Sequence, residues 1–91
     1  MRALNSILIE GEAGKVVAPY SKWTSPSAAF DLHTATTLGE PMTVRVASNR
    51  PDQVGRMVTT KAGTRVRIVG RIDRDDAGLY VYAEHSETVK A

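Results

Sequence analysis

Apolar and polar positions alternate along most of this 91-residue chain, and turn-forming residues interrupt the alternation at intervals. Alternation with a period of two is typical of a β-strand that buries one face. Two glycines in the first such segment, Gly11 and Gly14, predict the bend that a barrel strand needs. Five segments have strand character, at about residues 4–17, 28–37, 42–48, 64–73 and 79–86. The pattern therefore predicts an all-β protein.

The last two segments predict a hairpin with one apolar face. If the chain turns about Asp75 and Asp76, Tyr80 and Tyr82 face outward. The inward positions are then Val66, Ile68, Gly70, Ile72, Leu79, Val81 and Ala83. The outer cross-strand pairs are Arg71 with Tyr80, Val69 with Tyr82 and Arg67 with Glu84. A slip of one residue would exchange the two faces, so the register stays open at this point.

A short helix is predicted between the third and fourth strands. Val54, Met57 and Val58 are apolar at spacings of three and four. They follow Pro51, which suits the first position of a helix, so one or two helical turns are expected within residues 51–61. Such a helix would close one end of a barrel.

Composition places the chain among folded domains. With 42% hydrophobic and 24% charged residues, we expect a single domain over residues 1–91. There is no cysteine, which excludes disulfides and thiolate metal sites and favours the cytoplasm. The apolar run of residues 7–9 is too short for a signal peptide or a membrane span, so no membrane association is expected.

The charges permit a nucleic-acid partner. Twelve basic and ten acidic residues give a formal net charge of +2. Arginine predominates among the basic residues, and Arg65, Arg67 and Arg71 lie within one predicted strand. The planar guanidinium suits phosphate contacts and stacking on bases. Cross-strand pairing of these arginines with carboxylates is the other interpretation.

Four segments, taken in order, resemble the bacterial single-stranded DNA-binding protein family. They are residues 4–11 (LNSILIEG), 28–36 (AAFDLHTAT), 61–72 (KAGTRVRIVGRI) and 81–85 (VYAEH). The resemblance implies a five-stranded OB-fold barrel with a short helix between its third and fourth strands. It also implies largely sequence-independent binding of single-stranded DNA in replication, recombination or repair. RNA binding is a variant of that function, and replication or recombination proteins are the implied further partners.

The sequence departs from this family in its aromatic residues and in its tail. Where the family has base-stacking aromatic residues, the second and third strands and the loop before the fifth show Leu38, Val44 and residues 74–78. The chain also ends at Ala91 without the family's acidic tail. In both respects it is closer to the primosomal replication protein branch, which is tailless and dimeric. The resemblance thus implies a homodimer or a homotetramer.

Candidate nucleic-acid contacts come from the loop after the first strand and from outward strand positions. Trp23 could stack on a base or pack at a subunit interface, and both interpretations stay open. Arg45 faces outward on the third strand, on the expected ligand side of an OB barrel, and is the best single phosphate contact. The full set is Tyr20, Lys22, Trp23, Arg45, Arg65, Arg67, Arg71 and Arg74.

An oligomer interface is a competing use of the outer surface. The predicted outward positions leave apolar area that a monomer would rarely expose. The residues expected at this interface are Leu8, Val69, Tyr80 and Tyr82. The rival hypothesis for function is accordingly an OB-fold adaptor or oligomeric structural module with little or no nucleic-acid binding.

The sequence carries no signature of catalysis or of a cofactor. It has no nucleophile elbow, no catalytic cysteine and no paired-histidine helix, and His33 and His85 lack companions for a metal site. Residues 11–15 lack the first glycine and the Ser/Thr of a phosphate-binding loop. The aspartates within residues 73–76 lack EF-hand spacing. We therefore predict no enzyme activity, no metal and no cofactor.

Overall fold

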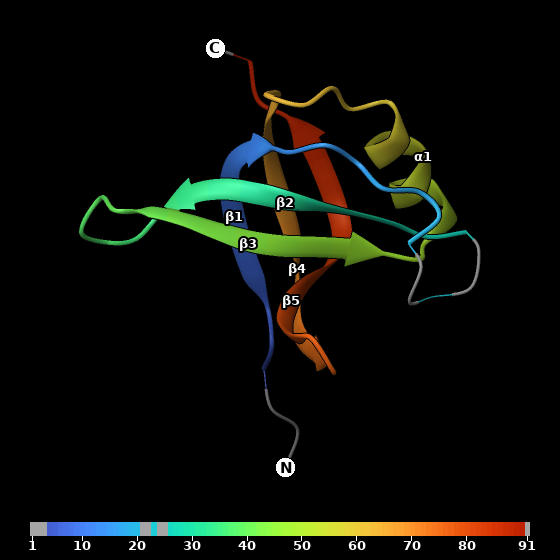
Figure 1. Ribbon diagram of the computed structural model, residues 1–91, viewed down its shortest axis with the longest axis horizontal. Helices are drawn as coiled ribbons and strands as arrows, with labels where there is room; N and C mark the ends of the chain where they lie inside the picture. Colours follow the sequence, from blue (N-terminus) through green and yellow to red (C-terminus); the bar gives the residue numbers. More distant parts are fainter. Residues whose placement is uncertain (1–3, 21–22, 24–25, 91) are drawn as a thin grey trace.

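The strands and the helix follow the predicted order. The computed structural model describes residues 4–20, 23 and 26–90 (Figure 1). Its elements are β1 (Ile7–Ala13), β2 (Ala28–Ala35), β3 (Pro41–Ser48), α1 (Pro51–Val58), β4 (Arg65–Asp75) and β5 (Gly78–Thr88). The all-β prediction and the helix between the third and fourth strands are confirmed. The first strand is shorter than predicted, and the last two are longer.

The strands close into a barrel in the order β1-β2-β3-β5-β4. Every hydrogen-bonded pair is antiparallel except β3 with β5, which is parallel. Figure 1 shows β2 and β3 crossing in front of β1, β4 and β5, with α1 beside one end of that crossing. This strand order, with a helix between β3 and β4, is that of an OB-fold barrel.

Strand β1 changes partner next to Gly11. It pairs with β4 over residues 7–12 and with β2 at Glu12 and Ala13. A Cβ atom at position 11 would lie 2.4 Å from the carbonyl oxygen of His33, so only glycine allows this close approach. Gly11 is therefore needed where β1 passes close to the backbone of β2.

The core fills the barrel from all five strands and from α1. In the helix, which begins at Pro51, Met57 packs into the core, whereas Val58, predicted with it, is exposed. The second buried helix residue is polar: Gln53 accepts a hydrogen bond at Oε1 from the Ser86 hydroxyl, at 2.8 Å. The buried core residues are Ala13, Ala28, Phe30, Leu32, Val46, Met57, Val66, Ile68, Val81 and Ala83.

The register of the β4–β5 hairpin differs from the predicted one. The chain turns at residues 76–77, so Ile72 pairs with Val81 and not with Leu79. A β-bulge between Val69 and Gly70 shifts the pairing by a further residue. Because the first shift is two residues, the inner and outer faces of the hairpin are preserved near its turn.

Ile72 and Leu79 correct the predicted core. Both were expected inside, but they are 44% and 70% exposed. They lie where the hairpin extends beyond the last backbone pair between β1 and β4, at Ile7 and Gly70. There they line a mostly apolar hollow of about 320 Å³ at the barrel's end. Facing inward does not bury these side chains where β1 no longer pairs with β4.

No helix within the described part of the chain is long and apolar enough to span a membrane.

Candidate nucleic-acid interface

The three tyrosines and the one tryptophan of the chain gather on one outer surface of the barrel. The ring of Trp23 is at the centre, with its centroid 5.6 Å from those of Tyr20 and Tyr80 and 6.0 Å from that of Tyr82. The contacts with Tyr20 and Tyr80 are edge-to-face, an arrangement that aromatic quadrupoles favour. We call Tyr20, Trp23, Tyr80 and Tyr82 the aromatic cluster.

Strand alternation explains where the aromatic cluster forms. On β5, Val81 and Ala83 point into the core, which leaves Tyr80 and Tyr82 on the outer face. Small side chains on the neighbouring strands, Ala29 on β2 and Ala47 on β3, give the rings a flat surface to pack on. The outer face of β2, β3 and β5 is thus covered by aromatic rings from a loop and a strand that are distant in sequence.

The loop that carries Tyr20 and Trp23 is tied to the barrel at its two ends. Val17 and Ala29 exchange backbone hydrogen bonds of 2.8 and 3.0 Å. The buried Ser27 hydroxyl accepts a hydrogen bond from the Tyr20 backbone N–H, at 2.9 Å. These contacts fix Tyr20 and Ser27 next to the sheet. Lys22, predicted as a phosphate contact, lies outside the described residues.

Tyr80, predicted at the oligomer interface, is buried within the protein. It lies on the outer face of β5, as predicted, but Trp23 packs over it and leaves it only 7% exposed. Burial raises the pKa of the Tyr80 hydroxyl, and the nearby charges of Asp73 and Asp75 raise it further. Tyr80 therefore lies beneath Trp23 within the aromatic cluster and offers little surface to a second subunit.

Arg45 lies beside the aromatic cluster and is held by several acceptors. Its Nη1 donates a hydrogen bond of 2.7 Å to the Tyr20 hydroxyl, and its Nη2 donates to Asp75 Oδ1 at 2.8 Å and to the Gly78 carbonyl at 3.1 Å. Its guanidinium carbon is 5.0 Å from the centroid of the Tyr80 ring, a cation–π contact. The hydrogen bond to Asp75 raises the pKa of Arg45.

Two hollows flank the aromatic cluster. One, of about 200 Å³, is lined by Lys15, Tyr20, Asp31 and Arg45 with residues of β2 and the preceding loop. The other is larger, at about 390 Å³, and is lined by Trp23, Asn49, Asp73, Tyr80 and Tyr82. The aromatic rings therefore stand between two concave surfaces, and both surfaces carry polar groups as well as ring edges.

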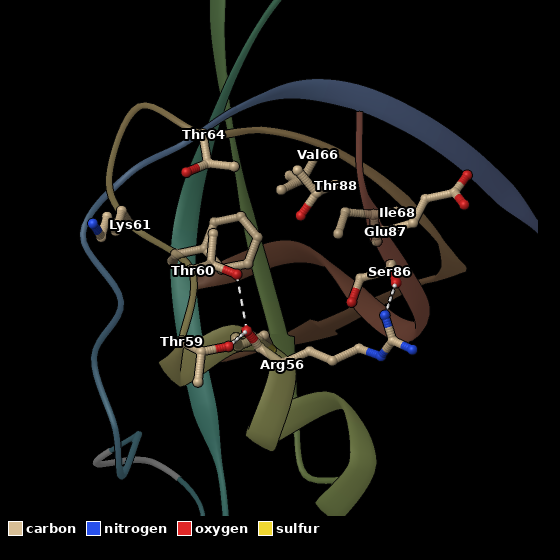
Figure 2. Close-up of a pocket in the computed structure, with 12 residues that line it drawn as sticks. Arg56, Thr59, Thr60, Lys61, Thr64, Val66, Ile68, Ser86, Glu87 and Thr88 are labelled. Carbon is tan, nitrogen blue, oxygen red and sulfur yellow. Dashed lines mark hydrogen bonds between the residues drawn. The ribbon is translucent and has the colours of Figure 1, made fainter. Parts of the chain in front are cut away.

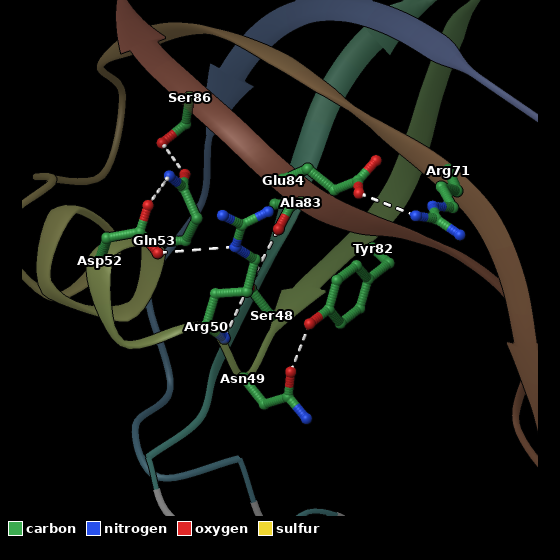
Figure 3. A network of polar contacts seen from close by, with 10 residues as sticks. All are labelled: Ser48, Asn49, Arg50, Asp52, Gln53, Arg71, Tyr82, Ala83, Glu84 and Ser86. Carbon is green, nitrogen blue, oxygen red and sulfur yellow. Dashed lines mark hydrogen bonds and ion pairs between the residues drawn. The ribbon is translucent and has the colours of Figure 1, made fainter.

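The three arginines predicted together on β4 lie on its outer face, where each meets a carboxylate. Arg65 and Arg67 contact the two oxygens of Glu10 on β1, at 2.9 and 3.0 Å. Arg67 also reaches Glu87 at 3.2 Å, and Arg71 reaches Glu84 at 3.1 Å (Figure 3). The hydrogen bond from Arg65, which has the largest effect, and the one from Arg67 lower the pKa of Glu10.

These pairs replace those expected from the predicted hairpin register. Arg67 was expected opposite Glu84 but lies opposite Glu87, because the turn shifts the pairing by two residues and the bulge by one more. Arg71 faces Tyr82 instead of Tyr80, and the cation–π contact belongs to Arg45.

Arg74 differs from the other strand arginines. It is exposed on β4 next to Asp73, and its side chain forms no ion pair with any residue that the structure describes. Lys15 likewise forms no ion pair within the described ranges, and it lines the smaller hollow. These two cations are available to an incoming anion, whereas those of Arg65, Arg67 and Arg71 are already matched.

The predicted interface residues divide between two surfaces. Leu8 and Val69 are direct cross-strand partners on the outer face of β1 and β4, where they are 65% and 36% exposed. Tyr82 is half-buried in the aromatic cluster, where its hydroxyl donates a hydrogen bond to Asn49 Oδ1 (Figure 3). Leu8 and Val69 together form the apolar part of the β1–β4 face.

Asn49, Asp73 and Lys15 were missed as candidates by sequence reasoning. Asn49 directly follows β3, and its sequence context predicts a turn residue. The sequence around Asp73 predicts a solvated turn. Only the folded barrel places them beside the aromatic cluster. No local pattern in the sequence would have identified them.

A further hollow, of about 340 Å³, lies between α1 and the ends of β4 and β5 (Figure 2). Its polar groups bond to neighbouring backbone: Arg56 Nη1 donates to the Ser86 carbonyl, and the Thr60 hydroxyl donates to the Arg56 carbonyl. The bond from Arg56 fastens the end of α1 to β5, and the bond from Thr60 closes the end of the helix. Among the described residues there is no group of three or more histidine, cysteine or acidic side chains that could hold a metal.

Solved structures share this fold at low sequence identity. The mitochondrial single-stranded DNA-binding protein of S. cerevisiae gives a TM-score of 0.78 at 11% identity, covering 98% of this chain and 97% of that one. The N-terminal domain of PriB from Thermoanaerobacter tencongensis, a dimeric structure, gives 0.70 at 15% identity, covering 96% and 98%. The S. pombe Stn1–Ten1 complex gives 0.75 at 15% identity, covering 97% of this chain and 60% of the matched chain.

These likenesses confirm, at the level of fold, the resemblance to single-stranded DNA-binding and primosomal OB barrels. No protein-family model matches the sequence, and no curated protein is similar to it. The chain spans less than two thirds of its match in the Stn1–Ten1 complex.

Proposed function

We propose that this protein binds single-stranded DNA, largely without regard to sequence, and catalyses no reaction. The observation that carries the proposal is the aromatic cluster on the outer face of β2, β3 and β5 of an OB barrel. Stacking of bases on aromatic rings contributes about 1–3 kcal/mol per base and tolerates any sequence. Solved structures with the same fold include a protein named for binding single-stranded DNA.

Trp23 and Tyr82 are the rings that bases would reach. Both are half-buried, so part of each ring faces solvent, whereas Tyr80 lies beneath them. Tyr20 is held by Arg45 at the other side of the cluster. A strand crossing the cluster from one hollow to the other would pass Tyr20, Trp23 and Tyr82 in turn.

Phosphate contacts in this proposal come chiefly from cations without a carboxylate partner. Arg74 and Lys15 meet that condition, and Lys15 lines the smaller hollow beside the aromatic cluster. Arg65, Arg67 and Arg71 can exchange their carboxylates for phosphate only at a cost, because each ion pair must first open. Arg45 would act mainly by holding Tyr20 and the β4–β5 hairpin in place. Binding should therefore be weak for an OB barrel.

The wider role follows from the same proposal. We expect a homodimer or homotetramer that works in DNA replication, recombination or repair in the cytoplasm. Residues 1–91 are expected to act as one OB domain, and RNA is a second substrate to be tested.

The test is to titrate the protein with oligo-dT of roughly twelve nucleotides at low salt while the emission of Trp23 is measured. Stacking on the only tryptophan should quench its emission, and duplex DNA of the same length should quench it less. Tyr82→Ala should weaken oligo-dT binding, whereas Tyr80→Phe, which keeps the buried ring, should not. A wild-type protein with neither quenching nor a mobility shift would refute the proposal.

A second candidate function rests on the β1–β4 face. Leu8 and Val69 form an exposed apolar pair there, next to arginines that are neutralised by Glu10, Glu84 and Glu87. A surface with apolar residues and paired charges suits a protein partner better than a polyanion. If oligo-dT does not bind, an adaptor or structural module using this face is the favoured function.

A further inference from the structure

The larger hollow beside the aromatic cluster has ring walls and two polar side chains. Trp23, Tyr80 and Tyr82 supply the walls, and Asn49 and Asp73 supply the polar groups, around about 390 Å³. The strand register places these groups together, because Asp73 on β4 is the direct cross-strand partner of Tyr80 on β5. Direct partners in an antiparallel pair have Cβ atoms about 5 Å apart. The hollow therefore presents a carboxylate next to a group of aromatic rings.

Asp73 is not explained by the binding of phosphates. Its negative charge would repel a backbone phosphate, and Arg71, two residues earlier on the same strand, is bound to Glu84. From the described residues the carboxylate accepts one hydrogen bond, from the backbone N–H of Arg74 to Oδ1 at 2.8 Å. Two carboxylate oxygens offer about four acceptor positions, so most of the capacity of Asp73 is open. An open carboxylate in this place suits a ligand with N–H donors.

Asn49 complements Asp73 because it offers donors. Its Oδ1 accepts the hydrogen bond from the Tyr82 hydroxyl (Figure 3). The two N–H groups of the Asn49 amide form no hydrogen bond with an acceptor in the described part of the chain. The hollow thus has acceptors at Asp73, donors at Asn49 and ring faces between them.

We propose that this hollow binds a guanine base, so that one position of the bound single strand is read while the rest is not. The inference rests on the proposed function, since the base arrives as part of a DNA strand. Guanine carries two adjacent donors, N1–H and N2–H, which match the two oxygens of Asp73. Its O6 and N7 are acceptors for the Asn49 amide, and its flat face stacks on Trp23 or Tyr82.

The other bases fit these groups less well. Thymine has one N–H donor between two carbonyl oxygens, which the carboxylate of Asp73 would repel. Adenine and cytosine each offer one exocyclic amine next to an acceptor nitrogen. Only guanine places two donors side by side on the edge that faces the carboxylate, and a good bidentate pair discriminates strongly between bases.

The test compares three oligonucleotides that differ at one position. The first is oligo-dT of roughly twelve nucleotides, the second has one central guanine, and the third has inosine there, which lacks only the N2 amine. We expect the guanine strand to bind at least about fivefold more tightly than oligo-dT, and inosine to lose most of that gain. Equal affinities for oligo-dT and the guanine strand would overturn the inference and leave the proposed function intact. If none of the three binds, both fail.

Variants locate the effect in the hollow. Asp73→Asn should abolish the preference for guanine and raise the affinity for oligo-dT, because a negative charge is removed near the phosphates. Asp76→Asn removes the same charge from the adjacent turn, outside the hollow, and should keep the preference. A guanine preference that survives Asp73→Asn, in a variant with an unchanged unfolding midpoint, would also overturn the inference.

Discussion

Arg45 on β3 and Asp75 at the end of β4 form an ion pair of 2.8 Å across the intervening strand β5. Both side chains are only 19% exposed, and the same guanidinium bonds the Gly78 carbonyl and the Tyr20 hydroxyl. A single side chain therefore connects the ligand face, the loop over it and the β4–β5 hairpin. Arg45 is better placed to hold these parts together than to make a free phosphate contact.

Replacement of Arg45 should therefore cost stability as well as affinity. Arg45→Ala removes the ion pair with Asp75 and releases Tyr20, and we expect a loss of about 1–3 kcal/mol in the free energy of unfolding. Arg67→Ala, at a more exposed pair, should cost less. Urea unfolding of the two variants provides the comparison. An equal or smaller loss for Arg45→Ala would show that the pair does not fasten the hairpin.

Glu10 makes the stability of the β1–β4 pairing depend on pH. Hydrogen bonds from Arg65 and then Arg67 hold the pKa of Glu10 below its ordinary value of 4.5. A carboxylate with a lowered folded-state pKa stabilises the protein above its unfolded-state pKa. That stabilisation is lost as the pH falls through the lowered folded-state pKa.

The prediction concerns the stability difference between wild type and Glu10→Gln. The difference should be constant from pH 7 to about pH 5 and should shrink as the pH falls below the ordinary pKa of the carboxylate. Glu12→Gln is the control, because Glu12 forms no ion pair with the residues described. Thermal or urea unfolding across this range measures both. A difference for Glu10→Gln that does not change with pH would contradict the assigned pairing.

The inner face of β4 could be predicted from alternation alone. Val66 and Ile68 are buried as predicted, because strands on both sides of β4 cover these positions. Ile72 has the same parity, yet β1 no longer pairs with β4 there. The end of a barrel is a property of how several strands meet, and the pattern within one strand does not contain it.

The ion pairs could not be predicted because they depend on the exact register. The turn shifts the pairing by two residues and the bulge at Val69 and Gly70 by one more, which together place Glu87, not Glu84, opposite Arg67. A Cβ atom at Gly70 would lie 1.9 Å from the Tyr82 carbonyl oxygen, so the backbone shape there needs glycine. Many strands contain a glycine without a bulge, so Gly70 alone does not predict the bulge from the sequence.

The aromatic cluster is the largest difference between the predicted and the observed site. Tyr20 and Trp23 were identified as ligand contacts, and Tyr80 and Tyr82 as an interface. In the fold all four pack together, because the loop before β2 lies over β5. The course of a loop across a sheet is set by long-range contacts, such as those of Tyr20 with Arg45 and Ser27, that no local pattern shows.

The apolar pair Leu8 and Val69 predicts an oligomer contact on the β1–β4 face. Val69→Glu would place a charge within that contact and should reduce the mass of the species measured by light scattering at micromolar concentration. Leu38→Glu adds the same charge at an exposed leucine in the β2–β3 turn and should leave the mass unchanged. A wild-type species of 9.9 kDa would contradict the prediction outright. An unchanged mass for Val69→Glu would place the contact elsewhere.

The division between free and paired arginines predicts how salt affects DNA binding. If about three to five phosphates are contacted, the logarithm of the affinity should fall against the logarithm of salt with a slope of roughly −2 to −3.5. Arg74 forms no ion pair within the described chain, so Arg74→Ala should lower affinity and flatten the slope by about 0.7. Arg67 is engaged by Glu10 and Glu87, and Arg67→Ala should leave the slope nearly unchanged. Titrations of Trp23 emission with oligo-dT at several salt concentrations measure both slopes. If Arg67→Ala flattens the slope as much as Arg74→Ala does, the ion pairs open on binding and the β4 arginines contact phosphate directly.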